Sequence, residues 1–113
     1  MEFVVEEVAP DVVCVALSGR LDTPGVDRIE TSFSAATVAG GRHALVDLTL
    51  VTFVSSMGVR MLLTTARAMG RRHLQVVLFG APALVRETLD NVAIDQIIPV
   101  RDTREAALAA LQA

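Results

Sequence analysis

Short apolar segments alternate along this chain with longer segments whose apolar residues recur every three or four positions. Segments of the first kind predict β-strands, and segments of the second kind predict amphipathic helices. Two strands come first, separated by a turn at Pro10-Asp11, and helices then alternate with strands to the end of the sequence. The predicted order is therefore β-β-α-β-α-β-α-β-α. This order predicts an α/β fold with a mostly parallel sheet, an N-terminal antiparallel strand and helices covering the sheet.

Turn and capping residues mark the ends of these elements. Asp22 or Thr23 is placed to cap the first helix, and Gly70 follows the last apolar position of the second. Asp102 and Glu105 have the spacing of a capping box at the start of the last helix. The strands are predicted at residues 3–9, 12–19, 43–51, 74–80 and 97–100. The apolar side of the third helix is predicted to consist of Leu84, Val85, Thr88, Leu89 and Val92.

Length and composition limit the class of protein. A chain of 113 residues has the size of one domain with a single hydrophobic core, which we expect to span residues 1–113. Although 52% of the residues are hydrophobic, no run approaches the ~18 apolar residues of a membrane span. Acidic residues stand where an export signal carries basic ones, so we expect a cytoplasmic protein without membrane insertion. The net charge of −3 disfavours nucleic acid as a partner.

Groups suited to catalysis or metal binding are few. All 10 basic residues are arginines, which excludes mechanisms that need a lysine, such as phosphate binding by a P-loop or phosphorelay by a receiver domain. His43 and His73 are the only histidines, and both stand at the starts of predicted strands, whereas sites in α/β sheets form at the carboxyl ends of strands. The single cysteine, Cys14, lies in a predicted buried strand. We therefore expect no catalytic site, no metal and no cofactor.

The segment TFVSSMGVRM, residues 52–61, places adjacent hydroxyls where a strand meets a helix. One of the two, Ser55 or Ser56, is expected to be the N-cap of the helix, a role that contributes ~1 kcal/mol. The other hydroxyl is not needed for that role. Gly58 in the first turn costs roughly 1 kcal/mol relative to alanine and suits close approach by another chain or a ligand. Because helix N-termini favour anions, a phosphate on either serine would be well placed.

Three stretches resemble STAS domains, the fold of bacterial anti-sigma factor antagonists. SGRLDTPGV, from Ser18, is similar to the Gly-x-Leu-Asp segment that follows the second strand of the family. ALVDLTLVTFVSSMGVRMLL, from Ala44, is similar to the family signature, in which a strand leads into Asp-Ser-Ser-Gly-Leu and a helix. The last part of the chain, from Val76, is similar to the closing β-α-β-α of the family. The resemblance covers nearly the whole chain and implies the STAS fold.

The resemblance also implies a set of site residues. Gly58 matches the signature glycine and Val59 the aliphatic residue after it, so the position of the family's phosphoserine falls on Met57. Methionine cannot carry a phosphate. Ser56, which precedes Met57, and then Ser55, which stands at the position of the family's Asp, are left as the candidate phosphorylation sites. The partner-binding residues that the resemblance implies are Asp22, Thr23, Ser55, Ser56, Met57, Gly58, Val59 and Arg60.

The function implied by the resemblance is that of a binding module rather than an enzyme. Such domains bind a serine-kinase-type anti-sigma factor and so release a sigma factor. Phosphorylation blocks the binding, and a PP2C-type phosphatase restores it. Two alternatives stay open: a STAS regulator that binds without a phosphate switch, and the STAS subunit of a bacterial phospholipid-transport ABC system. The helix face formed by Arg60, Arg67 and Arg71 fits a partner surface and a solvated helix side equally well.

Overall fold

The computed structural model describes residues 1–111, in which five strands form one sheet in chain order, β1-β2-β3-β4-β5. β1 runs antiparallel to β2, and the remaining neighbours are parallel. This confirms the predicted fold class and order of elements. The elements are β1 (Glu2–Ala9), β2 (Val12–Leu21), α1 (Thr23–Thr37), β3 (His43–Val54), α2 (Ser56–Arg71), β4 (Val76–Phe79), α3 (Ala83–Asn91), the 3-10 helix η1 (Ile94–Gln96), β5 (Val100–Arg101) and α4 (Arg104–Leu111).

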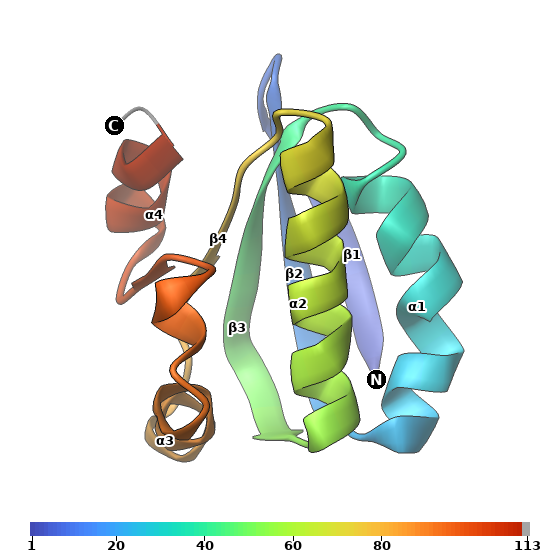
Figure 1. Ribbon diagram of the computed structural model, residues 1–113, viewed down its shortest axis with the longest axis vertical. Helices are drawn as coiled ribbons and strands as arrows, with labels where there is room; N and C mark the ends of the chain where they lie inside the picture. The colour runs from blue at the N-terminus through green and yellow to red at the C-terminus, as the bar shows by residue number, and fades with distance from the viewer. Residues whose placement is uncertain (112–113) are drawn as a thin grey trace.

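The helices form layers on the two faces of the sheet. α1 and α2 lie side by side on one face, in front of the strands in Figure 1, and α4 packs against β3, β4 and β5. Side chains of β3 and β4 alternate between two buried clusters because successive residues of a strand point to opposite faces. The larger cluster joins α1, α2 and α3 to the sheet, and the smaller one joins α4 to it. No helix among residues 1–111 is long and apolar enough to cross a membrane.

β3 is the central strand and sets the position of α2. Ala44, Leu45 and Val46 are fully buried, which agrees with the prediction of an aliphatic strand covered on both faces. The strand continues beyond its predicted end to Val54, which pairs with Leu21 at the end of β2. The carboxyl ends of β2 and β3 therefore reach the same edge of the sheet. α1 and α2 both begin at that edge, which is the lower one in Figure 1.

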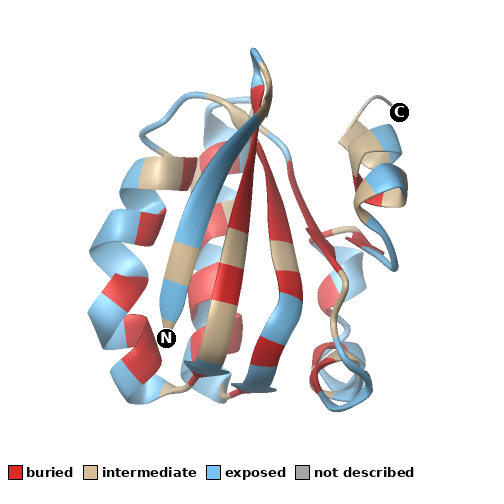
Figure 2. Ribbon diagram, turned by 180° about the vertical axis from the view of Figure 1, so that it is seen from behind, coloured by how far each residue is buried: buried red, intermediate tan, exposed pale blue. Residues whose placement is uncertain are grey.

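The second face of the sheet is covered only in part. Seen from behind in Figure 2, β1, β2 and β3 run in the open beside α4, and the exposed residues lie along β1 and in the second half of β3. Val4 in β1 is 68% exposed and Leu50 in β3 is 67% exposed. α4 thus protects the part of this face near Cys14 and Leu45 and leaves the remainder to solvent.

The end of α2 differs from its prediction. The helix continues through Gly70 to Arg71, and the residue with a positive φ is His73, at 60°. The backbone N–H of Leu74 then donates to the carbonyl oxygen of Met69 at 2.9 Å, and Leu74 packs against the larger core cluster. The left-handed residue at the end of α2 is therefore His73 and not Gly70, the glycine expected in that role. The residue that follows, Leu74, is half-buried.

The start of α4 also differs. The hydroxyl oxygen of Thr103 accepts a hydrogen bond from the backbone N–H of Ala106 at 3.1 Å, so Thr103 caps the first turn. The predicted capping residue, Asp102, instead has its carboxylate 3.4 Å from the guanidinium of Arg86. The predicted capping box of Asp102 and Glu105 was therefore wrong, and the capping side chain is that of the next residue, Thr103.

Candidate functional site

The candidate site is the edge of the sheet at which β2 and β3 end. The carbonyl oxygen of Leu21, the last residue of β2, accepts hydrogen bonds from Ser55 N at 3.0 Å and from Ser55 Oγ at 3.2 Å. These bonds hold the start of α2 beside the start of α1. Because both helices begin here, their free N–H groups and the positive ends of their dipoles lie at one edge of the molecule.

Ser55 is the N-cap of α2. Its backbone is extended, with φ −91° and ψ 175°, and its Oγ accepts a hydrogen bond from the backbone N–H of Gly58 at 3.3 Å. The same hydroxyl donates to the carbonyl oxygen of Leu21. The prediction that one of the two serines caps the helix is confirmed, and the hydroxyl of Ser55 is held on both sides by the protein.

Ser56 is placed differently. It is the first residue of α2, and it is exposed. Within residues 1–111 the hydrogen bonds of this turn are made by the hydroxyl of Ser55 and not by that of Ser56. Met57 beside it is 36% exposed, and Arg60, one turn further along α2, is exposed as well. Ser56, Met57 and Arg60 therefore form the outward side of the first turn.

Gly58 and Val59 face the interior instead. A Cβ atom on Gly58 would lie 2.5 Å from the carbonyl oxygen and 2.8 Å from the Cγ of Leu21. Val59 is only 7% exposed and belongs to the larger core cluster. The close approach expected at Gly58 is thus made by β2 of the same chain. Both residues, which the family resemblance places among the partner-binding residues, are buried beneath the exposed residues of this turn.

Asp22 is the N-cap of α1. Of the two residues predicted for this role, Asp22 and Thr23, the first is confirmed. Its Oδ1 accepts from Gly25 N at 2.9 Å, and its Oδ2 accepts from Arg20 Nε at 3.2 Å. The hydrogen bond from the Gly25 backbone, together with the Arg20 guanidinium, holds the pKa of Asp22 below its ordinary value. That guanidinium also lies over the ring of Phe53, 4.4 Å from its centroid, and so connects the ends of β2 and β3. Thr23, the first residue of α1, is exposed.

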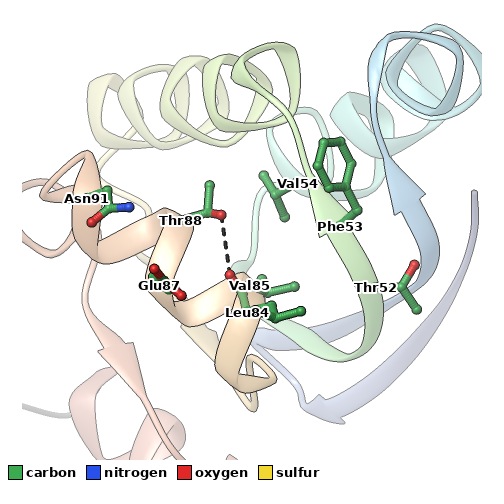
Figure 3. Close-up of a pocket in the computed structure, with 8 residues that line it drawn as sticks. All are labelled: Thr52, Phe53, Val54, Leu84, Val85, Glu87, Thr88 and Asn91. Atoms are coloured by element: carbon green, nitrogen blue, oxygen red, sulfur yellow. Dashed lines mark hydrogen bonds between the residues drawn. The ribbon is translucent and has the colours of Figure 1, made fainter.

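A groove of about 310 Å³ lies beside this edge, between the end of β3 and α3 (Figure 3). Leu84 is 74% exposed and Phe53 is 40% exposed at its rim. The dashed line in Figure 3 is the hydrogen bond that the hydroxyl of Thr88 donates to the carbonyl oxygen of Leu84, at 3.3 Å. The groove is lined by Thr52, Phe53, Val54, Leu84, Val85, Glu87, Thr88 and Asn91. It adjoins the start of α2, because Val54 immediately precedes Ser55.

The groove was not predicted, because the expected apolar side of α3 was partly wrong. Val85 and Leu89 are buried, but Leu84 is exposed and Val92, 50% exposed, lies beyond the end of the helix. Val85 and Leu89 are four residues apart, which is the spacing of one helix face, whereas Leu84 is turned from Val85 by about 100°. That spacing was the signal that could have identified Leu84 as a surface residue.

The histidines and the cysteine lie away from the edge at which β2 and β3 end. His43 begins β3, at the end of the strand away from Ser55, and its Nδ1 accepts from Gln75 N at 2.9 Å. His73 lies just before β4, so the predicted place of both histidines at the opposite edge is confirmed. Burial raises the pKa of the Cys14 thiol, an effect that the nearby Arg104 guanidinium offsets only in part. Within the described residues, no three His, Cys, Asp or Glu side chains are grouped so that they could hold a metal ion.

Comparison with known proteins agrees with this architecture. BtrV of Bordetella bronchiseptica, classed as an anti-sigma factor antagonist, is 28% identical over 101 residues, which are 89% of this chain and 87% of BtrV. An anti-sigma factor antagonist from Mycobacterium paratuberculosis has the same fold, with a TM-score of 0.86 at 23% identity over 99% of this chain and 94% of that one. The antagonist SpoIIAA of Bacillus, in its unphosphorylated form, gives a TM-score of 0.80 at 22% identity over 98% and 96% of the two chains.

The fold and the edge at which two helices begin are those of an α/β domain with a mixed five-stranded sheet, the same fold as in these solved structures. The STAS domain model matches residues 4–107, which is nearly the whole chain. The protein therefore belongs to the STAS domain family, as the resemblance of its sequence motifs predicted.

Proposed function

We propose that this chain is an anti-sigma factor antagonist that binds a serine-kinase-type anti-sigma factor at the edge where α1 and α2 begin, and thereby releases a sigma factor. Membership of the STAS family and the similarity to BtrV and SpoIIAA, both named as antagonists, support this class of function. The proposed contact residues are the exposed ones: Thr23, Ser56, Met57 and Arg60. Asp22, Ser55, Gly58 and Val59 hold that surface in place.

The observation that carries the proposal is the difference between the two adjacent hydroxyls. A phosphate on Ser55 would replace the hydrogen that its Oγ donates to the carbonyl oxygen of Leu21 and would crowd the oxygen that accepts from Gly58 N, and these two bonds fix the start of α2. Ser56 is exposed at the first position of the helix and can be modified with those bonds intact. SpoIIAA has been solved in a phosphorylated form. We infer that Ser56 is the phosphoryl acceptor of this chain.

A phosphate on Ser56 would alter the surface more than the fold. At a helix N-terminus it meets free N–H groups and the positive end of the dipole, so stability should stay within about 1 kcal/mol of the unmodified protein. An exposed pair with Arg60 adds only ~0–1 kcal/mol. In a complex, however, a charge beside Met57 loses its water, which costs several kcal/mol unless it is paired. Phosphorylation would therefore release the partner, and a PP2C-type phosphatase would restore binding.

A second candidate function is supported by one observation. Met57 stands where the family carries its phosphoserine, so a STAS regulator that binds its partner without a phosphate switch also fits this sequence. Both functions use the same contact edge. They differ only in whether Ser56 is modified.

The test is incubation of the chain with the kinase-type anti-sigma factor encoded in the same genome and with ATP, followed by mass spectrometry. We expect one phosphate on Ser56. Ser56→Ala should abolish incorporation, while Thr23→Ala, at the equivalent first position of α1, should not. Met57→Ser should create or improve a site, because it restores the residue that the family has before Gly58. Phosphate on Thr52, or none, would exclude the switch, and absence of binding in calorimetry would exclude the antagonist function.

We further propose that the protein acts in the cytoplasm as a single domain over residues 1–113 and has no catalytic activity of its own. Anti-sigma factor antagonists of the STAS family are regulatory binding proteins. The purified chain should therefore hydrolyse generic esters and nucleotides no faster than background. Turnover that disappears in Ser56→Ala would contradict the proposal.

A further inference from the structure

α2 carries three arginines and no acidic residue along its 16 positions. Arg60, Arg67 and Arg71 are all exposed, and the spacings of seven and four residues between them place them on one side of the helix. With a rise of about 1.5 Å per residue, they extend over about 16 Å. We call these three residues the α2 arginine stripe.

Among the described residues, the stripe has no carboxylate partner of the kind that several other arginines have. Within residues 1–111, the arginines paired with a carboxylate are Arg20, Arg28, Arg42, Arg86 and Arg104, and none of them belongs to α2. A shortage of carboxylates is not the reason, because the chain has 13 acidic and 10 basic residues. Arg67 and Arg71 are four residues apart, a spacing at which like charges weaken a helix. Arg71, in the last turn of α2, is favoured by the negative end of the helix dipole, but Arg60 and Arg67 lie outside that turn. The stability of α2 therefore does not explain the stripe as a whole.

The surroundings leave the stripe open to a partner. α1 packs along one flank of α2, and its Glu30 lines a groove of about 200 Å³ between the two helices together with Thr64 and Thr65. The outer side of α2 faces the viewer in Figure 1, with no element in front of it. The chain has a net charge of −3 and α2 contributes +3, so the other residues carry −6. The stripe is thus a narrow positive band on a negative protein.

We propose that the α2 arginine stripe binds an acidic segment of the protein that docks at the start of α2. This rests on the proposed function, because Arg60 lies one turn from Ser56 and the stripe continues the contact edge along the helix. Three carboxylates spaced over about three turns of a partner helix would match it.

A protein segment fits the stripe better than an extended polyanion does. DNA-binding proteins commonly neutralise about 6–10 phosphates, and membrane-binding polybasic segments carry about 4–8 basic residues. The stripe has three arginines, and the negative charge of the remaining chain opposes any longer anionic surface. A short acidic patch avoids that repulsion.

The first experiment uses a synthetic helical peptide whose three glutamates have the same spacing as the stripe, titrated at low salt into the isotope-labelled protein. NMR shift changes should follow the exposed side of α2 between residues 60 and 71. The triple variant Arg60→Gln, Arg67→Gln, Arg71→Gln should bind roughly tenfold more weakly, since exposed ion pairs contribute about twofold each and at most about fivefold. Arg101→Gln is the matched control, because Arg101 is an exposed arginine on β5, and it should change binding less than about twofold.

Three results would overturn the assignment: shift changes away from α2, equal binding by the triple variant, or tighter binding of the stripe to a DNA duplex or to phosphatidylglycerol vesicles than to the peptide. The second experiment uses the kinase-type anti-sigma factor of the same genome, and the triple variant should again lose roughly tenfold in affinity. If that kinase binds the triple variant normally but not Ser56→Asp, the stripe proposal fails and the proposed function stands. If the kinase does not bind the wild type while the peptide still maps to the stripe, the proposed function fails and the acidic-segment proposal stands.

Discussion

Replacing Gly58 by alanine should destabilise the protein, although alanine is the better helix former. The added Cβ would lie 2.5 Å from the carbonyl oxygen of Leu21, and Leu21 is fully buried. That oxygen also accepts the two hydrogen bonds that Ser55 donates, so it cannot move without weakening the attachment of α2 to β2. Overpacking of this kind costs about 1–3 kcal/mol, which outweighs a gain in helix propensity of at most about 1 kcal/mol.

Gly70 provides the matched control within the same helix. A Cβ there would have no atom within 4 Å, so Gly70→Ala should gain up to about 1 kcal/mol from helix propensity alone. Urea unfolding of both variants measures the difference, and thermal melting should separate them, at about 4 °C per kcal/mol for a domain of this size. A Gly58→Ala variant as stable as Gly70→Ala would refute the close packing of α2 on the end of β2.

Three further predictions concern single side chains. Ser55→Ala should lower the free energy of unfolding by about 1 kcal/mol and Ser56→Ala by less than about 0.5 kcal/mol, and equal losses in urea titrations would contradict the assignment of the cap. The pKa of Asp22 is lower in the folded protein, so the stability that it contributes is present above its unfolded pKa of about 3.9 and is lost as the pH falls below that value. Asparagine also caps helices but does not titrate, so the melting temperatures of wild type and Asp22→Asn should converge between pH 7 and pH 3, and a constant gap would count against this role. Cys14, 5% exposed and with a raised pKa, should react with a thiol reagent only on unfolding, whereas fast reaction of the native protein would mean that α4 does not cover it.

The order of elements could be predicted from sequence because each element has its own apolar period, two residues in strands and about 3.6 in helices. Helix ends were less predictable. A glycine near a helix end is the usual left-handed residue, yet α2 passes through Gly70 and the positive φ falls on His73. There the half-buried Leu74 packs against the larger core cluster, a contact that no local pattern contains.

The sequence was enough to place the candidate site in the segment of residues 52–61, but not to tell which of its two serines caps α2. Ser55 and Ser56 satisfy the capping preference equally well, so the sequence leaves the choice open. The choice is made by the Leu21 carbonyl, which bonds Ser55 from 34 residues away. The groove between β3 and α3 depends in the same way on tertiary contacts, since it forms only where the end of one element meets the side of another.

Calorimetric binding of the kinase-type anti-sigma factor to wild type, Ser56→Ala and Ser56→Asp tests the central claim most directly. If the start of α2 is the contact edge, wild type and Ser56→Ala should bind alike. Ser56→Asp should bind about 100-fold more weakly or worse, because a desolvated charge costs several kcal/mol and each ~1.4 kcal/mol is tenfold in affinity. Thermal melting should show all three proteins folded and within about 1 kcal/mol of one another. Normal binding by Ser56→Asp would mean that the partner does not contact this helix start, and would contradict the account.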